Sequence, residues 1–243
     1  MITLSGKKYW IVGASEGLGR ALAQQLAAAG AEVVVSARNA ERLKALCEEI
    51  GPQASWATID VTDAKSVEAA AKEIGRIDGM VYLAGVYWPM RSQDWDSAKI
   101  ETMCDINYTG GARVIGAILP EMVARDAGHI VLIGSLSGFR GVPGAIGYAP
   151  SKAGLMALGE CMYADLRQTG VQVQVINPGY VATRLTEKND FTMPFIMEPR
   201  QAADEIIFGM RAGKFKYSFP KIFSLFFRGT QFLPDWLHYR IFS

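Results

Sequence analysis

The sequence predicts an α/β fold, in which a single doubly wound parallel sheet carries helices on both faces. Three observations predict it. Short apolar runs alternate with amphipathic runs along most of the chain, which is typical of repeated strand–helix units. A glycine-rich turn follows the first apolar run. The chain has 243 residues without an evident repeat or linker, and this length supports one domain with a large core.

Each element follows from its hydrophobic pattern. Apolar runs predict strands at residues 8–12, 32–37, 54–59, 79–83, 129–133 and 171–176. Helical spacing predicts helices at residues 18–29, 40–50, 64–74, 96–125, 147–168 and 200–212. Residues 184–198 are expected to form a loop in which a short helix is possible.

The turn after the first strand is suited to binding a phosphate. Residues 13–19 read GASEGLG and lead into an amphipathic helix. Glycine allows a tight turn and a close approach of the backbone, and the helix N-terminus offers free amides and a positive dipole end to a pyrophosphate. The residues expected to contact it are Gly13, Ser15, Glu16, Gly17, Leu18 and Gly19.

The end of the second strand bears on the choice of cofactor. An acidic side chain there would bind the adenosine ribose hydroxyls and repel a 2′-phosphate. Ala37 leaves room and Arg38 brings positive charge, which favours NADP(H) over NAD(H). The alternative is a surface arginine without a ligand, and NAD(H) is the second choice of cofactor.

A serine, a tyrosine and a lysine are close together in the run SLSGFRGVPGAIGYAPSK. Ser135 follows the strand at 129–133, so its hydroxyl is expected at the carboxyl edge of the sheet, where open α/β sheets bind ligands. Tyr148 and Lys152 are four residues apart on a predicted helix and share one face. The ammonium is expected to lower the pKa of the phenol toward neutral pH, which would make Tyr148 a usable acid or base. An ordinary surface Tyr and Lys is the alternative.

Two further polar positions fall near the predicted site. Asp60 follows the third strand, and Asp63 or Thr62 behind it is a candidate to cap the next helix. Asn107 lies in an apolar helical segment, where asparagine is mildly unfavourable. It either breaks the helix beside the glycine pair at 110–111 or directs a polar group at the site.

Together these motifs resemble the short-chain dehydrogenase/reductase family of the single-domain type. The motifs that carry the resemblance are the glycine loop, Asp60, Asn107, Ser135, Tyr148-x-x-x-Lys152 and the run Pro178-Gly179-x-Val181-x-Thr183, all in one order. The resemblance covers roughly residues 5–212. It implies a single Rossmann-type catalytic domain over residues 1–213 and hydride transfer between a nicotinamide cofactor and a carbonyl or secondary alcohol.

The resemblance also implies a role for each matching residue. Tyr148 would act on the carbonyl or alcohol oxygen, Lys152 would lower the Tyr148 pKa and hold the nicotinamide ribose, and Ser135 would hydrogen-bond the substrate oxygen. Asn107 would hold a water in a proton relay behind the lysine, and Asp60 would contact adenine. Further cofactor contacts would come from Val61, Ala84, Gly85, Pro178, Gly179, Val181 and Thr183.

The sequence departs from the family pattern at four points. Val12 stands where a threonine is usual, and Tyr82-Leu83 stand where two asparagines are usual, so side-chain hydrogen bonds at the sheet edge are lost. Glu16 stands where many NADP-preferring members have a basic residue, and a carboxylate near a phosphate is unfavourable. The usual closing strand with its Asp-Gly-Gly ending is expected to be missing.

Residues 214–243 replace that ending and are expected to form an extension of the domain. They hold 10 of the 25 aromatic residues, and five basic residues against Asp235 give them a net charge of +4. Closely spaced phenylalanines between two prolines predict a short helix with an apolar side. The extension is expected near residues 184–198, where it would help to close the substrate pocket. It would pack on its own domain, on a neighbouring subunit or on a membrane surface.

The bulk properties limit the partners and the compartment. A net charge of +1 gives no sign of nucleic acid binding. Cys47, Cys104 and Cys161 are far apart, which fits free, buried thiols of a cytoplasmic protein, and two isolated histidines give no sign of a metal site. The sequence starts without a run typical of a signal peptide, and no run reaches the ~18 apolar residues of a membrane span.

The sequence therefore predicts an NADP(H)-dependent reductase of an apolar or bulky ketone or aldehyde. Relatives pair the helices corresponding to 96–125 and 147–168, which implies a homodimer or homotetramer. The alternatives are an NAD-dependent alcohol dehydrogenase, a cofactor-binding sensor without turnover and a membrane-attached interaction protein. By analogy with the family, the pocket wall is expected to include Val86, Tyr87, Trp88, Phe139, Val142, Tyr180 and parts of residues 185–198.

Overall fold

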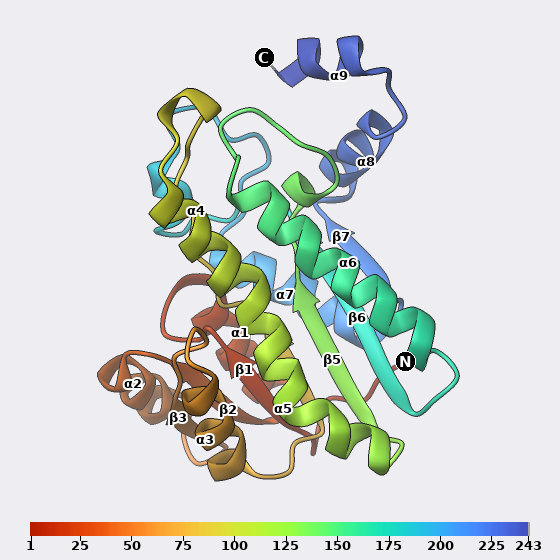
Figure 1. The fold of residues 1–243 in the computed structure, drawn as a ribbon. Coiled ribbons are helices and arrows are strands. Elements are labelled where there is room, and N and C mark those ends of the chain that lie inside the picture. Colours follow the sequence, from red (N-terminus) through yellow and green to blue (C-terminus); the bar gives the residue numbers. More distant parts are fainter. Residues whose placement is uncertain (243) are drawn as a thin grey trace.

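The computed structural model describes residues 1–242, and its centre is a seven-stranded parallel sheet (Figure 1). The strands lie in the order β3-β2-β1-β4-β5-β6-β7. Their bounds are β1 (Lys8–Val12), β2 (Glu32–Ala37), β3 (Ala54–Thr58), β4 (Gly79–Tyr82), β5 (Gly128–Ile133), β6 (Val171–Pro178) and β7 (Lys216–Phe219). The order changes direction between β1 and β4, so the carboxyl edge above these two strands is the expected place for a ligand. The predicted α/β fold with a doubly wound parallel sheet is confirmed.

Helices cover both faces of the sheet (Figure 1). The helices are α1 (Gly17–Ala28), α2 (Ala40–Ile50), α3 (Ala64–Ile74), α4 (Ser97–Cys104), α5 (Gly110–Ala124), α6 (Tyr148–Leu166), α7 (Pro199–Ala212), α8 (Lys221–Thr230) and α9 (Asp235–Phe242). One apolar cluster joins α1, α2 and α7 to one face, and a second joins α3, α5 and α6 to the other. Both faces are buried, which explains why the strands are apolar runs rather than alternating ones.

Local capping explains where several helices begin. The side chain of Asn39 accepts a hydrogen bond from the backbone of Arg42 at the start of α2, and Asp63 accepts one from Lys65 at the start of α3. The predicted cap at Asp63 is confirmed. α7 ends at Gly213, whose φ of 67° lies in the left-handed region that favours glycine.

The long helical segment at 96–125 is interrupted in its middle. A π-helical turn, Asp105–Thr109, separates α4 from α5 and carries the buried Asn107. The buried hydroxyl of Tyr82 donates a 2.5 Å hydrogen bond to the carbonyl of Ile106 in this turn. Tyr82, which stands at a departure from the family pattern, therefore supports the segment that presents Asn107. Single π turns of this kind occur frequently at functional sites.

The end of the chain differs from the expectation. β7 pairs with β6 from Val175 to Pro178, so the closing strand is present and the expectation that it is missing is wrong. The strand has only four residues, and its lysine and tyrosine resemble the rest of the basic, aromatic tail. α8 is the helix predicted between the two prolines, whereas α9 was not predicted.

α8 and α9 lie beyond the carboxyl edge of the sheet, above β7 in Figure 1. Among residues 1–242, no helix has the length and apolar character needed to cross a membrane. The three cysteines are free, but Cys161 is exposed and the other two are half-buried. The expectation of buried thiols is therefore wrong.

Candidate active site

The glycine-rich turn lies against the ends of two other strands. A Cβ at Gly13, where φ is 102°, would be 2.6 Å from the backbone nitrogen of Ala84, and a Cβ at Gly19 would be 2.1 Å from the carbonyl oxygen of Gly13. Gly17 has a φ of 54°, and a Cβ there would be 3.1 Å from the side chain of Thr183. No side chain caps the start of α1. A narrow backbone cradle in front of an uncapped helix N-terminus fits a dinucleotide pyrophosphate.

The other residues predicted for the cofactor lie on the same edge of the sheet. They are in the turn after β1, in the first turn of α1, directly after β4, or at and after the end of β6. These residues are Ser15, Leu18, Ala84, Gly85, Pro178, Gly179 and Val181.

Glu16 is paired with two arginines that sequence reasoning missed. Its carboxylate oxygens lie 2.5 Å from Arg42 Nη1 and 2.6 Å from Arg184 Nη2. Two guanidinium groups against one carboxylate leave an excess of positive charge beside the cradle. The concern that Glu16 disfavours a phosphate is therefore reduced. Arg42 lies four residues after Arg38, one helical turn in sequence, and this spacing was the signal that could have identified it.

Asp60 is held after β3 by its neighbour Thr62. The Thr62 hydroxyl and backbone N–H donate to Asp60 Oδ1 at 2.7 and 2.9 Å. These hydrogen bonds, helped by the charge of Arg38, keep the pKa of Asp60 below its ordinary value. The carbonyl of the next residue, Val61, accepts a hydrogen bond from Arg113. Asp60 is therefore ionised and close to the exposed Arg38. The two residues follow β3 and β2, so they lie at one end of the candidate site.

Ser135, Tyr148 and Lys152 meet at the carboxyl end of β5. The side chains of Tyr148 and Ser135 are hydrogen-bonded to each other, and Ser135 Oγ lies 2.9 Å from Ser137 Oγ. Lys152 Nζ, one helical turn after Tyr148, is 5.9 Å from the centre of its ring. The ammonium donates to the carbonyl of Ile133 at 2.9 Å. The structure therefore brings together the three side chains predicted for proton transfer.

Burial sets the ionisation of this group. It raises the pKa of Tyr148 to about 12, and the hydrogen bond with Ser135 opposes the rise only in part. It lowers the pKa of Lys152 to about 8. The expectation that the ammonium lowers the Tyr148 pKa toward neutrality is wrong, because burial of the phenol dominates its pKa. At neutral pH Tyr148 is a protonated phenol and Lys152 is largely an ammonium.

Asn107 connects the start of α6 to the strand end that carries Gly85. Its amide oxygen accepts from the backbone of Val86 at 2.8 Å, and its amide nitrogen donates to the Val86 carbonyl at 3.0 Å and to Ser151 Oγ at 2.9 Å. A Cβ built on Gly85 would lie 3.3 Å from Asn107 Oδ1 and 3.7 Å from Lys152 Nζ. Asn107 therefore lies in the helix interruption beside the glycine pair, and its side chain and Lys152 Nζ both approach Gly85.

One wall of the site is formed by residues 86–88 and the loop at 184–198. The ring of Tyr87 packs edge-on against Tyr148 with 5.0 Å between centroids, and its hydroxyl donates to Asn189 at 2.9 Å. Lys188 Nζ donates to the Tyr87 carbonyl at 2.7 Å and lies 4.8 Å from the centre of the Trp88 ring. These contacts hold the loop over the side of Tyr148. A contribution of this loop to the wall was predicted, but Lys188 and Asn189 were not singled out, because nothing in the loop sequence indicates where it folds back.

The tail packs against the loop that follows Ser135 and against the end of β6. The buried Phe223 and Phe227 of α8 pack with Leu136, and a set of half-buried residues surrounds them: Phe139, Val142, Tyr180 and Phe242. Phe223 also lies 5.6 Å, between ring centres, from Phe195 in the loop at 184–198. The prediction that the tail lies near this loop is confirmed. A Cβ at Gly179 would be 3.2 Å from Phe223, so the end of β6 directly contacts the tail.

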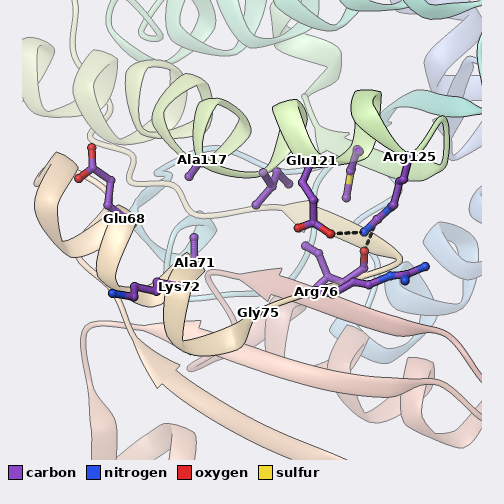
Figure 2. Close-up of a pocket in the computed structure, with 11 residues that line it drawn as sticks. Glu68, Ala71, Lys72, Gly75, Arg76, Ala117, Glu121 and Arg125 are labelled. Atoms are coloured by element: carbon purple, nitrogen blue, oxygen red, sulfur yellow. Dashed lines mark hydrogen bonds and ion pairs between the residues drawn. The ribbon is translucent and has the colours of Figure 1, made fainter.

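A second concavity lies away from this group. Figure 2 shows a pocket of about 440 Å³ between α3 and α5, in which Arg125 pairs with Glu121 and donates to the carbonyl of Ile77. The segments that line it precede β4 and β5, so it opens at the amino edge of the sheet. None of the residues predicted for the site lines it. The candidate active site is therefore the carboxyl edge.

Comparison with known proteins agrees with this geometry. Residues 7–193 match the family model for short chain dehydrogenases. An uncharacterized oxidoreductase from Myxococcus xanthus is 37% identical over 97% of this chain and 96% of its own, and one from Staphylococcus epidermidis is 31% identical over 82% and 89%.

Among solved structures, a short-chain dehydrogenase from Sphingobium yanoikuyae in complex with NADPH is 28% identical, with a TM-score of 0.82 and 88% of each chain covered. The family model spans most of the chain. The protein belongs to the short-chain dehydrogenase/reductase family and is an oxidoreductase.

Proposed function

We propose that the protein is an NADPH-dependent reductase of apolar ketones or aldehydes. The observation that carries this proposal is the protonated Tyr148, hydrogen-bonded to Ser135 at the carboxyl edge of the sheet. A phenol with a pKa of about 12 holds its proton at neutral pH and is suited to protonate an alkoxide as it forms. Bound NADPH would supply the hydride.

The other residues of the site would bind the substrate oxygen, bind the cofactor and position Tyr148. Ser135 would hydrogen-bond the substrate carbonyl oxygen and direct it to the Tyr148 hydroxyl. Lys152 would place positive charge behind the developing oxyanion and donate to the cofactor ribose. Asn107 would fix the first turn of α6 through Ser151, which itself donates to the Tyr148 carbonyl at 2.8 Å. This arrangement would keep the phenol and the ammonium in one geometry.

An assay of NADPH oxidation against a graded series of carbonyl compounds tests the proposal. We expect turnover that improves as the substrate becomes larger and more apolar. If NADPH binds but no carbonyl is reduced, the protein is a cofactor-binding sensor instead. If turnover occurs with NADH alone, the cofactor assignment is wrong while the reductase assignment stands.

The proposed preference for NADP(H) rests on the arginines beside the cradle. We expect that Ala37→Asp combined with Arg38→Ala reverses the preference toward NAD(H). Loss of a charge-assisted phosphate contact costs roughly 1.5–3 kcal/mol, or about tenfold to a hundredfold in Kd for NADPH. The two dissociation constants are measured by fluorescence titration, with Arg20→Ala, which removes an arginine paired to Glu49, as the control. Wild-type protein that binds NADH as tightly as NADPH would refute the assignment.

The tail is proposed to close the entrance for bulky substrates, and Arg140 is the residue that anchors it. Its guanidinium donates to the carbonyls of Thr230 and Leu233 at 2.8 and 2.7 Å and pairs with Asp235. The loop that carries Ser135 is thereby tied to the linker between α8 and α9. The backbone carbonyl of Phe139 in this loop also accepts a hydrogen bond from Gln231 at 2.8 Å.

We expect Arg140→Ala to release the tail and to raise KM for bulky carbonyls about fivefold or more. Breaking charge-assisted hydrogen bonds of this kind costs roughly 2 kcal/mol. KM for small carbonyls and Kd for NADPH should change little, because the glycine-rich turn and the hydroxyl of Tyr148 lie outside the tail. Arg167→Ala, at an exposed arginine after α6, is the control. Equal effects on small and bulky substrates would show that the tail does not form the entrance.

We further propose a cytoplasmic homo-oligomer. The free cysteines support the location. The exposed apolar side chains of Val123 on α5 and Tyr163 on α6 support an interface along these two helices. Light scattering at micromolar concentration gives the mass, and a monomer would refute this assembly.

A further inference from the structure

α8 is apolar on both of its sides, although only one side is covered. Its inner side, Phe223 and Phe227, is buried against the wall of the active site. Its outer side carries Ile222, Leu225 and Phe226, which are 73%, 67% and 45% exposed. Lys221, Ser224 and Arg228 occupy a narrow polar arc of α8, so its apolar arc is wider than the side that the domain covers. The outer side of α8 therefore lacks the contact that its composition requires.

The exposed apolar surface continues beyond α8 on both sides. In the linker and in α9 it includes Phe232 and Trp236, which are 88% and 70% exposed, and Tyr239 and Ile241. Phe226 is linked to α9 through Phe242, at 5.8 Å between ring centres. On the other side it reaches the loop at 184–198, where three residues are exposed: Phe191, Phe195 and Ile196. We call this surface, from residues 191–196, α8, the linker and α9, the apolar cap.

The charge of the tail distinguishes between the possible occupants of the apolar cap. The apolar cap contains three basic residues, Lys221, Arg228 and Arg240, and its acidic residue Asp235 is paired with Arg140. A second copy of the chain would place this basic surface against an identical basic surface in a two-fold interface. An anionic lipid surface instead attracts this charge, and it accepts exposed apolar side chains at the same time.

The shape of the tail also fits a lipid surface. α8 and α9 have 10 and 8 residues, so they can lie in an interface but cannot span a bilayer. They project from the carboxyl edge of the sheet in Figure 1, which leaves this end of the molecule clear to approach a plane. Trp236 and Tyr239 are side chains that favour the boundary between headgroups and acyl chains.

We propose that the apolar cap docks on an anionic phospholipid membrane. The inner side of α8 remains on the active-site wall, while the outer side, the linker and α9 enter the headgroup region. Docking of this kind places the entrance beside Tyr180 and Phe139 at the lipid surface. The membrane proposal does not depend on the reductase proposal, because it concerns the outer face of the tail.

Co-sedimentation of the full chain with vesicles tests the docking. We expect binding to vesicles of phosphatidylcholine with phosphatidylglycerol, weak binding to phosphatidylcholine alone, and loss of binding in high salt. Phe232→Glu with Trp236→Glu should lower the partition coefficient roughly tenfold or more. Trp56→Glu is the matched control, because Trp56 is 40% exposed on β3 at the opposite edge of the sheet. Its binding should equal that of the wild type.

A charge variant and two further measurements make the outcome unambiguous. Lys221→Glu, at the exposed first residue of α8, should weaken binding to the anionic vesicles only. This variant tests the docking independently of the double variant, which can be unstable. Thermal unfolding by circular dichroism shows whether each variant is folded. A wild type that does not bind anionic vesicles overturns the proposal. A double variant that binds normally, or one that changes the mass in light scattering without changing vesicle binding, also overturns it. The last result would assign the apolar cap to a second copy.

Discussion

Replacement of Tyr148 by phenylalanine is expected to lower kcat for carbonyl reduction by about 10²–10⁴-fold. The hydroxyl that Ser135 holds by a hydrogen bond is the group proposed to give its proton to the substrate oxygen. The ring remains in place against Tyr87, so the pocket should keep its shape. Kd for NADPH is expected to stay within about twofold, because the removed hydroxyl acts on the substrate.

The matched control is Tyr87→Phe. Its hydroxyl donates to Asn189, and its ring is the edge-on neighbour of Tyr148. This variant removes a phenolic hydroxyl from the same wall without removing the proposed acid, so its effect on kcat should be less than about tenfold. Stopped-flow measurement of NADPH oxidation in a single turnover separates the chemical step from product release. Comparable losses in the two variants would mean that Tyr148 is not the proton donor.

Most of the fold could be predicted from the sequence, because each of its strands and helices has a recognisable local hydrophobic pattern. Strands buried on both faces appear as apolar runs, and the helices between them have an apolar face and clear ends, as with Asp63 at the start of α3. β7 was not predicted, because it has only four residues and lacks a clear apolar run: Lys216 is exposed and Tyr217 is half-buried. Its place in the sheet is set by pairing with β6 rather than by its own pattern.

The positions of the site residues were also predictable, since the carboxyl ends of parallel strands come to one edge. The protonation states of these residues could not be predicted from the sequence. The spacing of Tyr148 and Lys152 indicates that they share a helix face, but it does not show that the ammonium donates to the carbonyl of Ile133. Burial, which dominates both pKa values, is a property of the packed site. The pairing of Glu16 with Arg184 could not be predicted either, because the two residues are far apart in the sequence and only the folded loop brings them together.

Replacement of Lys152 by methionine is expected to stabilise the free protein while abolishing turnover. Lys152 is 4% exposed, and burial lowers its pKa from 10.5 to about 8. At pH 7 the folded protein therefore keeps the ammonium at a cost of roughly 3 kcal/mol. Methionine removes the charge but leaves the Ile133 carbonyl without its donor, which returns roughly 1–2 kcal/mol of that gain. The net increase in the free energy of unfolding should be about 1–2 kcal/mol.

The pH dependence separates this explanation from a general packing effect. Between about pH 8 and pH 10.5 the folded wild type loses the Lys152 proton while the unfolded chain keeps it. The unfolded state then binds more protons, so the cost of burial is relieved and the wild type gains stability as pH rises. The advantage of Lys152→Met in denaturant unfolding should therefore shrink across this window.

Lys44→Met, at a lysine whose side chain is 68% exposed, should show neither the gain nor its pH dependence. In the wild type, kcat/KM for carbonyl reduction should fall as pH rises through about 8, because the ammonium is lost there. A stability advantage that is the same at pH 7 and pH 10 would show that the buried charge is not its cause.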